Sequence, residues 1–234
     1  MGFYDNYNFD GLKLLSKIKA NPTVAEPCPE FVGIVKQMKS TTPRAGRNLC
    51  VAEIGIGLGA TALQIVKTLG ENDIYVCFDF EETLKNFTDD LNVGNFDVKC
   101  KVVPLGNSSK TWDSYNYNLS NLILNMRKDN ADGYFDVVYL DGAHTFLHDG
   151  LAVCMLKQLI KKGGYLILDD LFWTYNNNID KRKSVESKLP KYQIDDRQIL
   201  RVQEIFLRYD PNFEKLSDDK SWRGVFRKRP LVTP

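Results

Sequence analysis

Short apolar runs alternate with segments of helical periodicity through most of the chain. The runs have strand length and predict five β-strands, at 48–54, 73–80, 98–105, 135–141 and 163–170. Apolar residues three and four positions apart predict helices after the first four strands, at 61–69, 81–92, 111–129 and 145–162. Strands that are apolar on both faces and alternate with helices are typical of a parallel sheet covered on both sides. The expected fold class is therefore α/β, with a doubly wound, mainly parallel sheet.

The flanking parts carry weaker patterns. Helices are expected there at 10–19, 29–39 and 195–208, and the Asn- and Lys-rich stretch 174–193 predicts a loop with some helix. The segments FEKLS and WRGVFRKR, joined by the turn-like DDK, predict a C-terminal antiparallel strand pair. We expect one domain over 1–234, made of an N-terminal helical extension, a cofactor-binding core and a C-terminal part, at 1–47, 48–170 and 171–234.

Composition excludes several kinds of partner. The 31 basic residues against 30 acidic ones leave a net charge of +1, so a large basic surface for nucleic acid is not expected. No apolar stretch approaches the ~20 residues that span a bilayer, and the N-terminal segment lacks the layout of a secretory signal. The five cysteines form no Cys-x-x-Cys pair, which favours free thiols in a reducing cytoplasm. We therefore expect a cytoplasmic protein with a small-molecule substrate, binding neither nucleic acid nor membrane.

The first predicted strand runs into alternating glycines, in the segment VAEIGIGLGATAL. Gly55, Gly57 and Gly59 form a turn at which backbone N–H groups can approach a ligand, and Glu53 precedes the turn inside the strand. In open α/β sheets, ligands bind beyond the carboxyl ends of the strands. Asp79, at the end of the second strand, stands where a ribose-binding acid is expected, and it could also cap the next helix. The glycine spacing also fits a dinucleotide site or a turn without a ligand, although a dinucleotide site needs no Glu53.

A second acidic cluster is expected at the ends of the fourth and fifth strands. Asp141 ends the fourth strand, while Asp169 and Asp170 end the fifth, and one right-handed crossover should make these strands neighbours. Three carboxylates this close repel one another and lose hydration, which a cation would offset. Oxygen ligands suit Mg²⁺ or another hard divalent ion. Helix capping, a turn or an ion pair with Arg are the alternatives for these acids.

The segment 51–170 resembles the class I S-adenosylmethionine-dependent methyltransferases, in which an acid precedes Gly-x-Gly-x-Gly. The resemblance implies a Rossmann-like methyltransferase fold. It also implies that the acid and the glycines hold the methionine part of the cofactor, and that Asp79 binds the ribose hydroxyls. The loop PLGNSS looks like the adenine-side loop, which makes Gly106, Asn107 and Ser108 cofactor-binding candidates.

The segment DGAH resembles the metal-dependent O-methyltransferases of the macrolide-sugar and catechol type. In both, an Asp ends strand four and an acidic pair, or Asp-Asn, ends strand five. The catechol enzymes carry a Lys base three residues after the first Asp, whereas His144 stands there in this chain, as in the sugar-type enzymes. The resemblance implies that Mg²⁺ or Mn²⁺ binds Asp141, Asp169 and Asp170, and that His144 beside Asp141 is the base.

The expected function is thus a metal-dependent O-methyltransferase that uses S-adenosylmethionine. Its substrate would be a small polar molecule such as a sugar, a glycan precursor, a natural-product intermediate or a phosphate-like group. A nicotinamide-dependent oxidoreductase and a non-catalytic S-adenosylmethionine-binding module are the alternatives. His148 could pair with His144 as a metal ligand or lie at the surface, and Phe172, Trp173 and Tyr175 could line a substrate pocket or pack under a loop.

Overall fold

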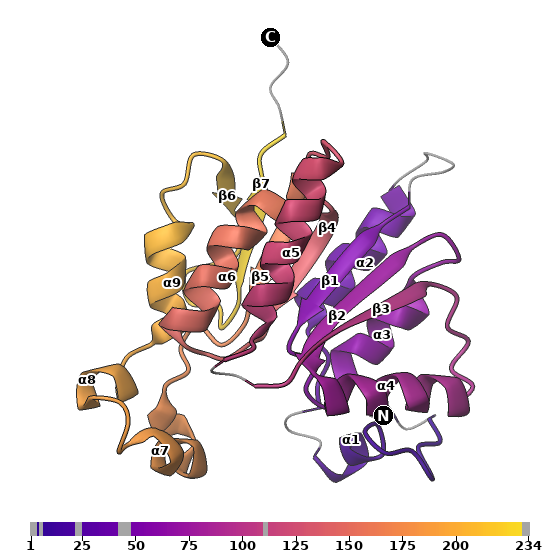
Figure 1. Cartoon of the computed structure of the whole chain (residues 1–234), viewed down its shortest axis with the longest axis horizontal. Helices are drawn as coiled ribbons and strands as arrows, with labels where there is room; N and C mark the ends of the chain where they lie inside the picture. Colours follow the sequence, from indigo (N-terminus) through magenta and orange to yellow (C-terminus); the bar gives the residue numbers. More distant parts are fainter. Residues whose placement is uncertain (1–3, 5–6, 22–24, 42–47, 110–111, 231–234) are drawn as a thin grey trace.

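The computed structural model describes residue 4 and residues 7–21, 25–41, 48–109 and 112–230 (Figure 1). Its strands are β1 Cys50–Ile54, β2 Ile74–Phe80, β3 Lys101–Asn107, β4 Phe135–Leu140, β5 Ile160–Leu168, β6 Phe213–Lys215 and β7 Gly224–Lys228. Its α-helices are α1 Lys17–Ala20, α2 Pro29–Thr41, α3 Ala60–Thr68, α4 Glu81–Val93, α5 Tyr115–Lys128, α6 Phe146–Leu159, α7 Ile179–Val185, α8 Lys191–Ile194 and α9 Gln198–Phe206. A short 3-10 helix, η1, covers Tyr175–Asn177.

The strands form one seven-stranded sheet in the order β3-β2-β1-β4-β5-β7-β6. β1 to β5 are parallel, while β7 pairs antiparallel with both β5 and β6. The predicted fold class is confirmed, including the C-terminal antiparallel pair. The direction of winding reverses between β1 and β4, which in open α/β sheets is where ligands bind.

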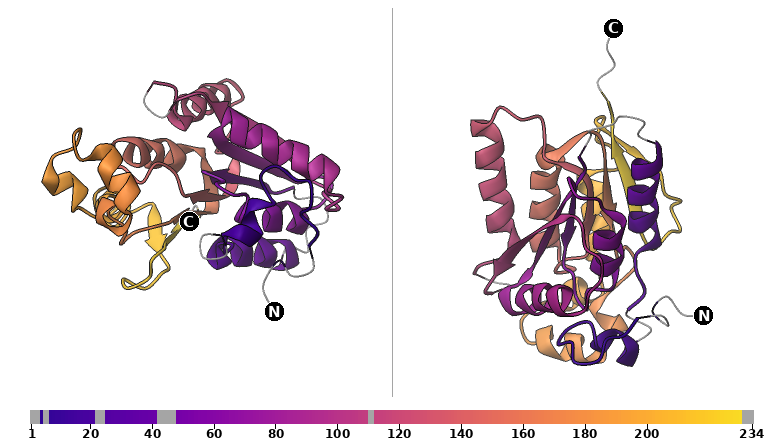
Figure 2. Two further views of the ribbon diagram at one scale, coloured as in Figure 1. Left: turned by 90° about the horizontal axis from the view of Figure 1, so that it is seen from below. Right: turned by 90° about the vertical axis from the view of Figure 1, so that its right-hand side faces the viewer.

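Helices cover both faces of the sheet, as Figures 1 and 2 show. On one face, residues of α2, α3 and α4 join the N-terminal segment in a first hydrophobic cluster, and on the other face α5, α6 and α9 form a second. Successive residues of β1 point to opposite faces, with Val51 in the first cluster and Ala52 in the second. All six residues of β4 are buried, which explains its continuous apolar sequence.

The expected helix at 10–19 is wrong for most of its length. Only Lys17–Ala20 is helical, and the chain before it turns. The carboxylate of Asp90, a buried residue of α4, accepts the backbone N–H groups of Lys13, Leu14 and Leu15 at 2.7–2.9 Å. Because these donors are used by a distant acid, they need no helical partner.

Two strand boundaries also differ from the prediction. β3 begins and ends later than the predicted 98–105, so that Gly106 and Asn107 pair with Asp79 and Phe80 inside the sheet rather than in a loop. β5 begins earlier than predicted, at Ile160, and its pairing with β4 contains a register shift. Gly106 and Asn107 are thus the last two residues of β3.

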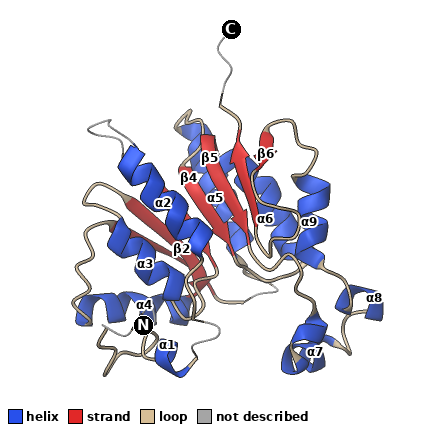
Figure 3. Ribbon diagram, turned by 180° about the vertical axis from the view of Figure 1, so that it is seen from behind, coloured by secondary structure: helices blue, strands red, loops and turns tan. Residues whose placement is uncertain are grey.

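The segment after β5 projects from the layered body. η1, α7 and α8 fall within the stretch expected to be a loop with some helix, and Figures 1 and 3 show α7 and α8 beyond the edge of the sheet. Figure 1 shows α7 and α8 on the same side as α1, next to the carboxyl ends of the parallel strands. Within the described residues, no helix combines the length and the apolar character needed to cross a bilayer.

Candidate active site

The glycine turn after β1 packs against the end of β4. The N–H of Asp141 donates to the carbonyl of Ile54 at 2.9 Å. This hydrogen bond joins the last residue of β1 to the residue that follows β4. A Cβ on Gly55 would lie 1.9 Å from the carbonyl oxygen of Asp141, and φ at Gly55 is +86°. This position therefore requires glycine. Gly57 also has a positive φ, +53°, but a Cβ there would meet nothing within 4 Å.

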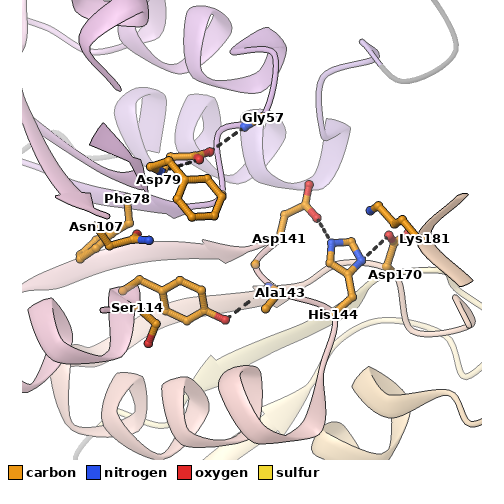
Figure 4. A pocket seen from close by; sticks show the side chains of 14 residues that line it. Gly57, Phe78, Asp79, Asn107, Ser114, Asp141, Ala143, His144, Asp170 and Lys181 are labelled. Atoms are coloured by element: carbon orange, nitrogen blue, oxygen red, sulfur yellow. Dashed lines mark hydrogen bonds and ion pairs between the residues drawn. The ribbon is translucent and has the colours of Figure 1, made fainter. Parts of the chain in front are cut away.

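Asp79 lies beside this turn, one residue before the end of β2. Its carboxylate accepts the N–H of Gly57 at 3.1 Å and that of Phe80 at 2.7 Å (Figure 4). Burial raises the pKa of Asp79, and the backbone N–H groups that donate to it offset this only in part. The hydrogen bonds fix the carboxylate next to the glycine turn.

A pocket of about 360 Å³ opens at the carboxyl ends of the central strands. Its wall consists of Gly55, Gly57, Phe78, Asp79, Phe80, Asn107, Ser114, Tyr115, Asp141, Gly142, Ala143, His144, Asp170 and Lys181. Figure 4 shows Asp79 and Asn107 at one end of the pocket and His144, Asp170 and Lys181 at the other. One cavity is therefore lined by members of both clusters that the sequence singled out.

Of the three residues predicted in the PLGNSS segment, only Asn107 lines this pocket. It is buried, and its side-chain oxygen accepts no hydrogen bond within the described chain, which leaves an acceptor at the pocket wall. The N–H and hydroxyl of Ser108 both donate to the carboxylate of Asp113, at 2.8 and 2.9 Å. A Cβ on Gly106 would lie 2.7 Å from Cγ of Glu81, so this glycine permits close packing of α4 on β3.

Glu53 and Gly59 lie behind the turn, outside the pocket wall. Glu53 is 1% exposed, and its Oε2 accepts the hydroxyl hydrogen of Tyr75 at 2.6 Å. Burial raises the pKa of Glu53 to about 8, although the Tyr75 hydrogen bond acts in the opposite direction. A Cβ on Gly59 would lie 3.0 Å from Leu15 and 3.1 Å from Phe87. Both residues support the turn, and a contact of either with a cofactor stays a prediction.

Asp141, His144 and Asp170 form a compact group at the other end of the pocket. Nε2 of His144 lies 3.1 Å from Oδ1 of Asp141, and its Nδ1 lies 3.0 Å from Oδ2 of Asp170. One possible ligand atom from each of the three lies within 4.8 Å of the others. Burial first, and then the nearby charges of Asp169 and Asp170, raise the pKa of Asp141 well above its usual value.

Asp169 has different partners from Asp170. Its Oδ1 lies 3.1 Å from Nε of Arg223, and its Oδ2 accepts a short hydrogen bond from the hydroxyl of Tyr139. Arg223 also contacts Glu30 of α2, with Nη1 3.2 Å from Oε2. Among the described residues, Asp169 is not part of the group whose ligand atoms converge, and its predicted role as a metal ligand stays a prediction.

A buried carboxylate holds the turn that carries His144. Asp149 of α6 is 1% exposed, and it accepts the hydroxyl hydrogen of Tyr115 at 2.7 Å and the N–H groups of Ala143 and Thr145 at 3.3 and 2.8 Å. The backbone of His144 is left-handed, with φ +57°, which costs free energy for a residue other than glycine. These hydrogen bonds stabilise the unusual backbone.

The aromatic residues after β5 differ in what they contact. The ring of Trp173 lies 5.2 Å from that of His144, edge to face, and 4.9 Å from that of Tyr175. Phe172 packs 5.8 Å from the ring of Trp222 instead. His148 is not part of the converging ligand group, and its Nδ1 lies 2.8 Å from the hydroxyl of Thr145. Trp173 is thus the aromatic residue that bounds the imidazole.

Tyr115, Tyr139, Lys181 and Arg223 complete the site, and the sequence reasoning did not single them out. Tyr139 stands two residues before Asp141 in β4, so strand periodicity alone places both on one face of the sheet. Lys181 comes from α7 and Arg223 directly precedes β7, and no local sequence pattern places either residue at the site.

The group around His144 fits a divalent cation by its donor chemistry. The carboxylate oxygens of Asp141 and Asp170 suit Mg²⁺ or Mn²⁺. The imidazole between them already contacts both acids, so a cation bound by the two carboxylates would share them with a histidine. The same imidazole is placed to receive a proton from a molecule in the pocket, because it lines the pocket wall.

Comparison with known proteins adds a family and a fold. A family model described as a methyltransferase domain matches residues 52–171. No curated protein matches the chain. A structural-genomics target from Corynebacterium glutamicum has a TM-score of 0.60 at 16% identity, with 94% of this chain and 91% of that chain covered.

Two further solved structures carry O-methyltransferase names. A protein from Staphylococcus aureus, assigned as a caffeoyl-CoA O-methyltransferase, has a TM-score of 0.57 at 11% identity, covering 93% of this chain and 92% of its own. An O-methyltransferase from Bacillus cereus in complex with SAH has a TM-score of 0.54 at 12% identity, covering 92% and 86%. At these identities, the likeness to the solved structures concerns the fold alone.

Proposed function

The chain belongs to the methyltransferase family whose domain model matches residues 52–171, and from that membership we propose an S-adenosylmethionine-dependent O-methyltransferase that binds a divalent cation. One observation carries the proposal. A single pocket has the glycine turn with Asp79 at one end and the group of Asp141, His144 and Asp170 at the other. A methyl donor and an acceptor could therefore meet inside one cavity.

The cofactor would bind at the end formed by the first three strands. Asp79 would accept hydrogen bonds from the ribose hydroxyls, as acids in this position of α/β sheets do. The open side of Gly57 lets the cofactor approach the backbone, and Asn107 offers an unused buried oxygen. Glu53 would act indirectly, through the strand beneath the turn, because its carboxylate is bonded to Tyr75.

The acceptor oxygen would lie near His144. S-adenosylmethionine supplies a methyl group already activated by its sulfonium, and a divalent cation lowers the pKa of a bound hydroxyl. Asp141 and Asp170 would hold the cation. His144 would take the acceptor proton on its ring, which Asp141 and Asp170, 3.1 and 3.0 Å from its two nitrogens, would orient. Trp173 limits the movement of that ring.

The acceptor class follows from the resemblance in the DGAH segment and from the polar character of this end of the pocket. We propose a small polar acceptor, such as a sugar, a glycan precursor or a natural-product intermediate, methylated at oxygen. A phosphate-like oxygen is compatible with the same cation. Membership of the methyltransferase family leaves the nicotinamide-dependent alternative without support.

Calorimetry with the purified chain tests the proposal. S-adenosylhomocysteine should bind with one site per chain, whereas NADH should bind at least tenfold more weakly. Mn²⁺ should bind to the wild type and much more weakly to Asp141→Asn. If the chain binds neither S-adenosylmethionine nor its demethylated product, the proposal is overturned. If it binds the cofactor but does not bind Mn²⁺, the metal part of the proposal is overturned.

A further inference from the structure

A second and larger hollow lies beside the proposed active site. Its volume is about 910 Å³, and it is bounded by the first turn of α6, by η1, α7 and α8, and by the start of α9. Thr145, Phe146 and His148 in its wall come directly after His144 in the chain. The hollow is therefore separated from the imidazole by only one turn of backbone.

One face of the α7 segment runs along both cavities. Lys181 lines the pocket that contains His144, whereas Ser184, Val185 and Lys188 line the second hollow. Lys181, Ser184 and Val185 lie three and four positions apart in α7 and so share a helix face, and Lys188 lies in the turn that follows α7. Tyr175, whose ring contacts that of Trp173, belongs to the wall of the second hollow. A molecule held by this face of α7 would reach from one cavity into the other.

Large, exposed apolar side chains belong to the wall of the second hollow. Leu147 is 75% exposed and Tyr192 is 73% exposed, and both belong to its wall. Phe146, Val185 and Leu189 line the same hollow. Large apolar side chains gathered around a cavity are typical of a binding site for an apolar or aromatic group.

The wall of the hollow also carries one lysine in addition to a paired acid and base. Of the five basic residues of segment 179–194, Lys188 alone lines this hollow, whereas Lys181 lines the first pocket and Lys191 pairs with Asp195. Within the hollow, Asp196 is neutralised by Arg201, with Nε 2.6 Å from Oδ2. Lys188 has no acidic partner within the described chain and so presents a free cation.

We propose that the second hollow binds the part of the acceptor remote from the methylated oxygen, and that this part combines an apolar, preferably aromatic, group with an anionic group. The inference rests on the proposed function and deepens it, because it adds a remote apolar and anionic part to the polar group that is methylated at His144. The apolar group packs on Tyr192 and Leu147. The anion pairs with Lys188, while the oxygen that receives the methyl group lies at His144.

A pair of fluorescent probes tests this chemistry directly. 8-Anilino-1-naphthalenesulfonate combines an aromatic body with an anion, and N-phenyl-1-naphthylamine is the same body without the charge. Both are titrated against the full chain, alone and in saturating S-adenosylhomocysteine, which fills the first pocket. Lys188→Gln should weaken the sulfonate probe about threefold to fivefold, as expected for a partly exposed charge pair, and leave the neutral probe unchanged.

Two further variants localise the binding. Tyr192→Ser should weaken both probes about threefold or more, because the aromatic contact is shared. Lys183→Gln is the matched control, since it removes a lysine charge five residues earlier in the same segment but does not line the hollow, and it should change neither affinity. Circular dichroism checks that each variant is folded. If Tyr192→Ser fails this check, Leu189→Ser replaces it.

The proposal is overturned if Lys188→Gln and Lys183→Gln have equal effects on the sulfonate probe, or if Tyr192→Ser leaves both probes unchanged. Failure of the proposed function gives a different result: calorimetry of the wild type then shows no binding of S-adenosylhomocysteine. The probe titrations without S-adenosylhomocysteine still compare the variants in that case.

Discussion

Nε of Arg223 lies 3.1 Å from Oδ1 of Asp169, so the first acid after β5 is paired with a cation of the chain itself. The second acid, Asp170, instead faces Nδ1 of His144. Two adjacent and chemically identical side chains therefore have different surroundings. One is bound to the C-terminal hairpin and to Tyr139, and the other lines the pocket.

This division predicts unequal effects on metal binding. Asp170→Asn should weaken Mn²⁺ binding at least tenfold, because it removes a charged oxygen from the converging group. Asp169→Asn should weaken it less, since that acid is neutralised by Arg223. Calorimetry or paramagnetic resonance of bound Mn²⁺ measures both. Equal losses in the two variants would mean that Asp169 leaves Arg223 and binds the cation directly.

Asp79→Ala should weaken the binding of S-adenosylhomocysteine by roughly 1–3 kcal/mol, the cost of leaving buried hydroxyls without a charged acceptor. The same change frees the N–H of Gly57, so the turn also loses a hydrogen bond. Asp113→Ala serves as a control, because that acid closes the neighbouring loop through Ser108 and does not line the pocket. Unchanged cofactor affinity in Asp79→Ala would contradict its role at the ribose.

His144→Ala should reduce turnover by roughly 10²–10⁴-fold, the usual contribution of a general base, and leave cofactor affinity nearly unchanged. His144→Gln keeps hydrogen-bonding capacity but takes no proton at neutral pH, so it should be nearly as slow. The assay is single-turnover methyl transfer once an acceptor is found. High activity in the Gln variant would show that the ring only positions the acceptor.

Glu53 should make the protein less stable as pH rises. Its pKa is raised from 4.5 to about 8 by burial, so the folded state retains a proton that the unfolded state has lost between these values. The contribution of this group to the free energy of unfolding is full below pH 4.5 and falls by roughly 1.4 kcal/mol per pH unit until about pH 8.

Glu53→Gln removes this titration while keeping an oxygen for the hydroxyl of Tyr75. Urea denaturation between pH 5 and 8 should give a flatter pH dependence for the variant and a higher stability near pH 8. Glu71→Gln changes an exposed acid and should leave the wild-type dependence intact. A variant with the wild-type slope would show that Glu53 is ionised in the folded protein throughout this range.

The central sheet could be predicted because its pattern is local. Each strand is a continuous apolar run bounded by polar residues, and the alternation with helices leaves few topologies. The helix expected at 10–19 was wrong because its N–H groups bind Asp90, a residue more than seventy positions away. No local pattern contains such a partner.

The candidate site was predictable only in part, for the same reason. Because Asp79, Asp141 and Asp170 stand at or near the ends of predicted parallel strands, the sequence placed them on one side of the sheet, and all three line the same pocket. Adjacent residues point to different sides, however, so the environments of Asp169 and Asp170 depend on where the hairpin of β6 and β7 places Arg223. Likewise, Glu53 is turned away from the pocket by Tyr75, a residue of the neighbouring strand.

The segment that follows β5 and projects from the sheet could be exchanged to change which acceptor the protein binds. No residue from 173 to 198, all of which are described, belongs to either hydrophobic cluster, whereas Leu171 and Ile199 on either side do. Tyr175, Ile194 and Gln198 within the stretch are buried and would have to be kept, but replacing its other residues would leave both clusters intact. Grafting the segment between relatives, with those buried residues kept, would therefore change the acceptor side of the proposed site and leave Gly57, Asp79 and Asn107 on the donor side in place.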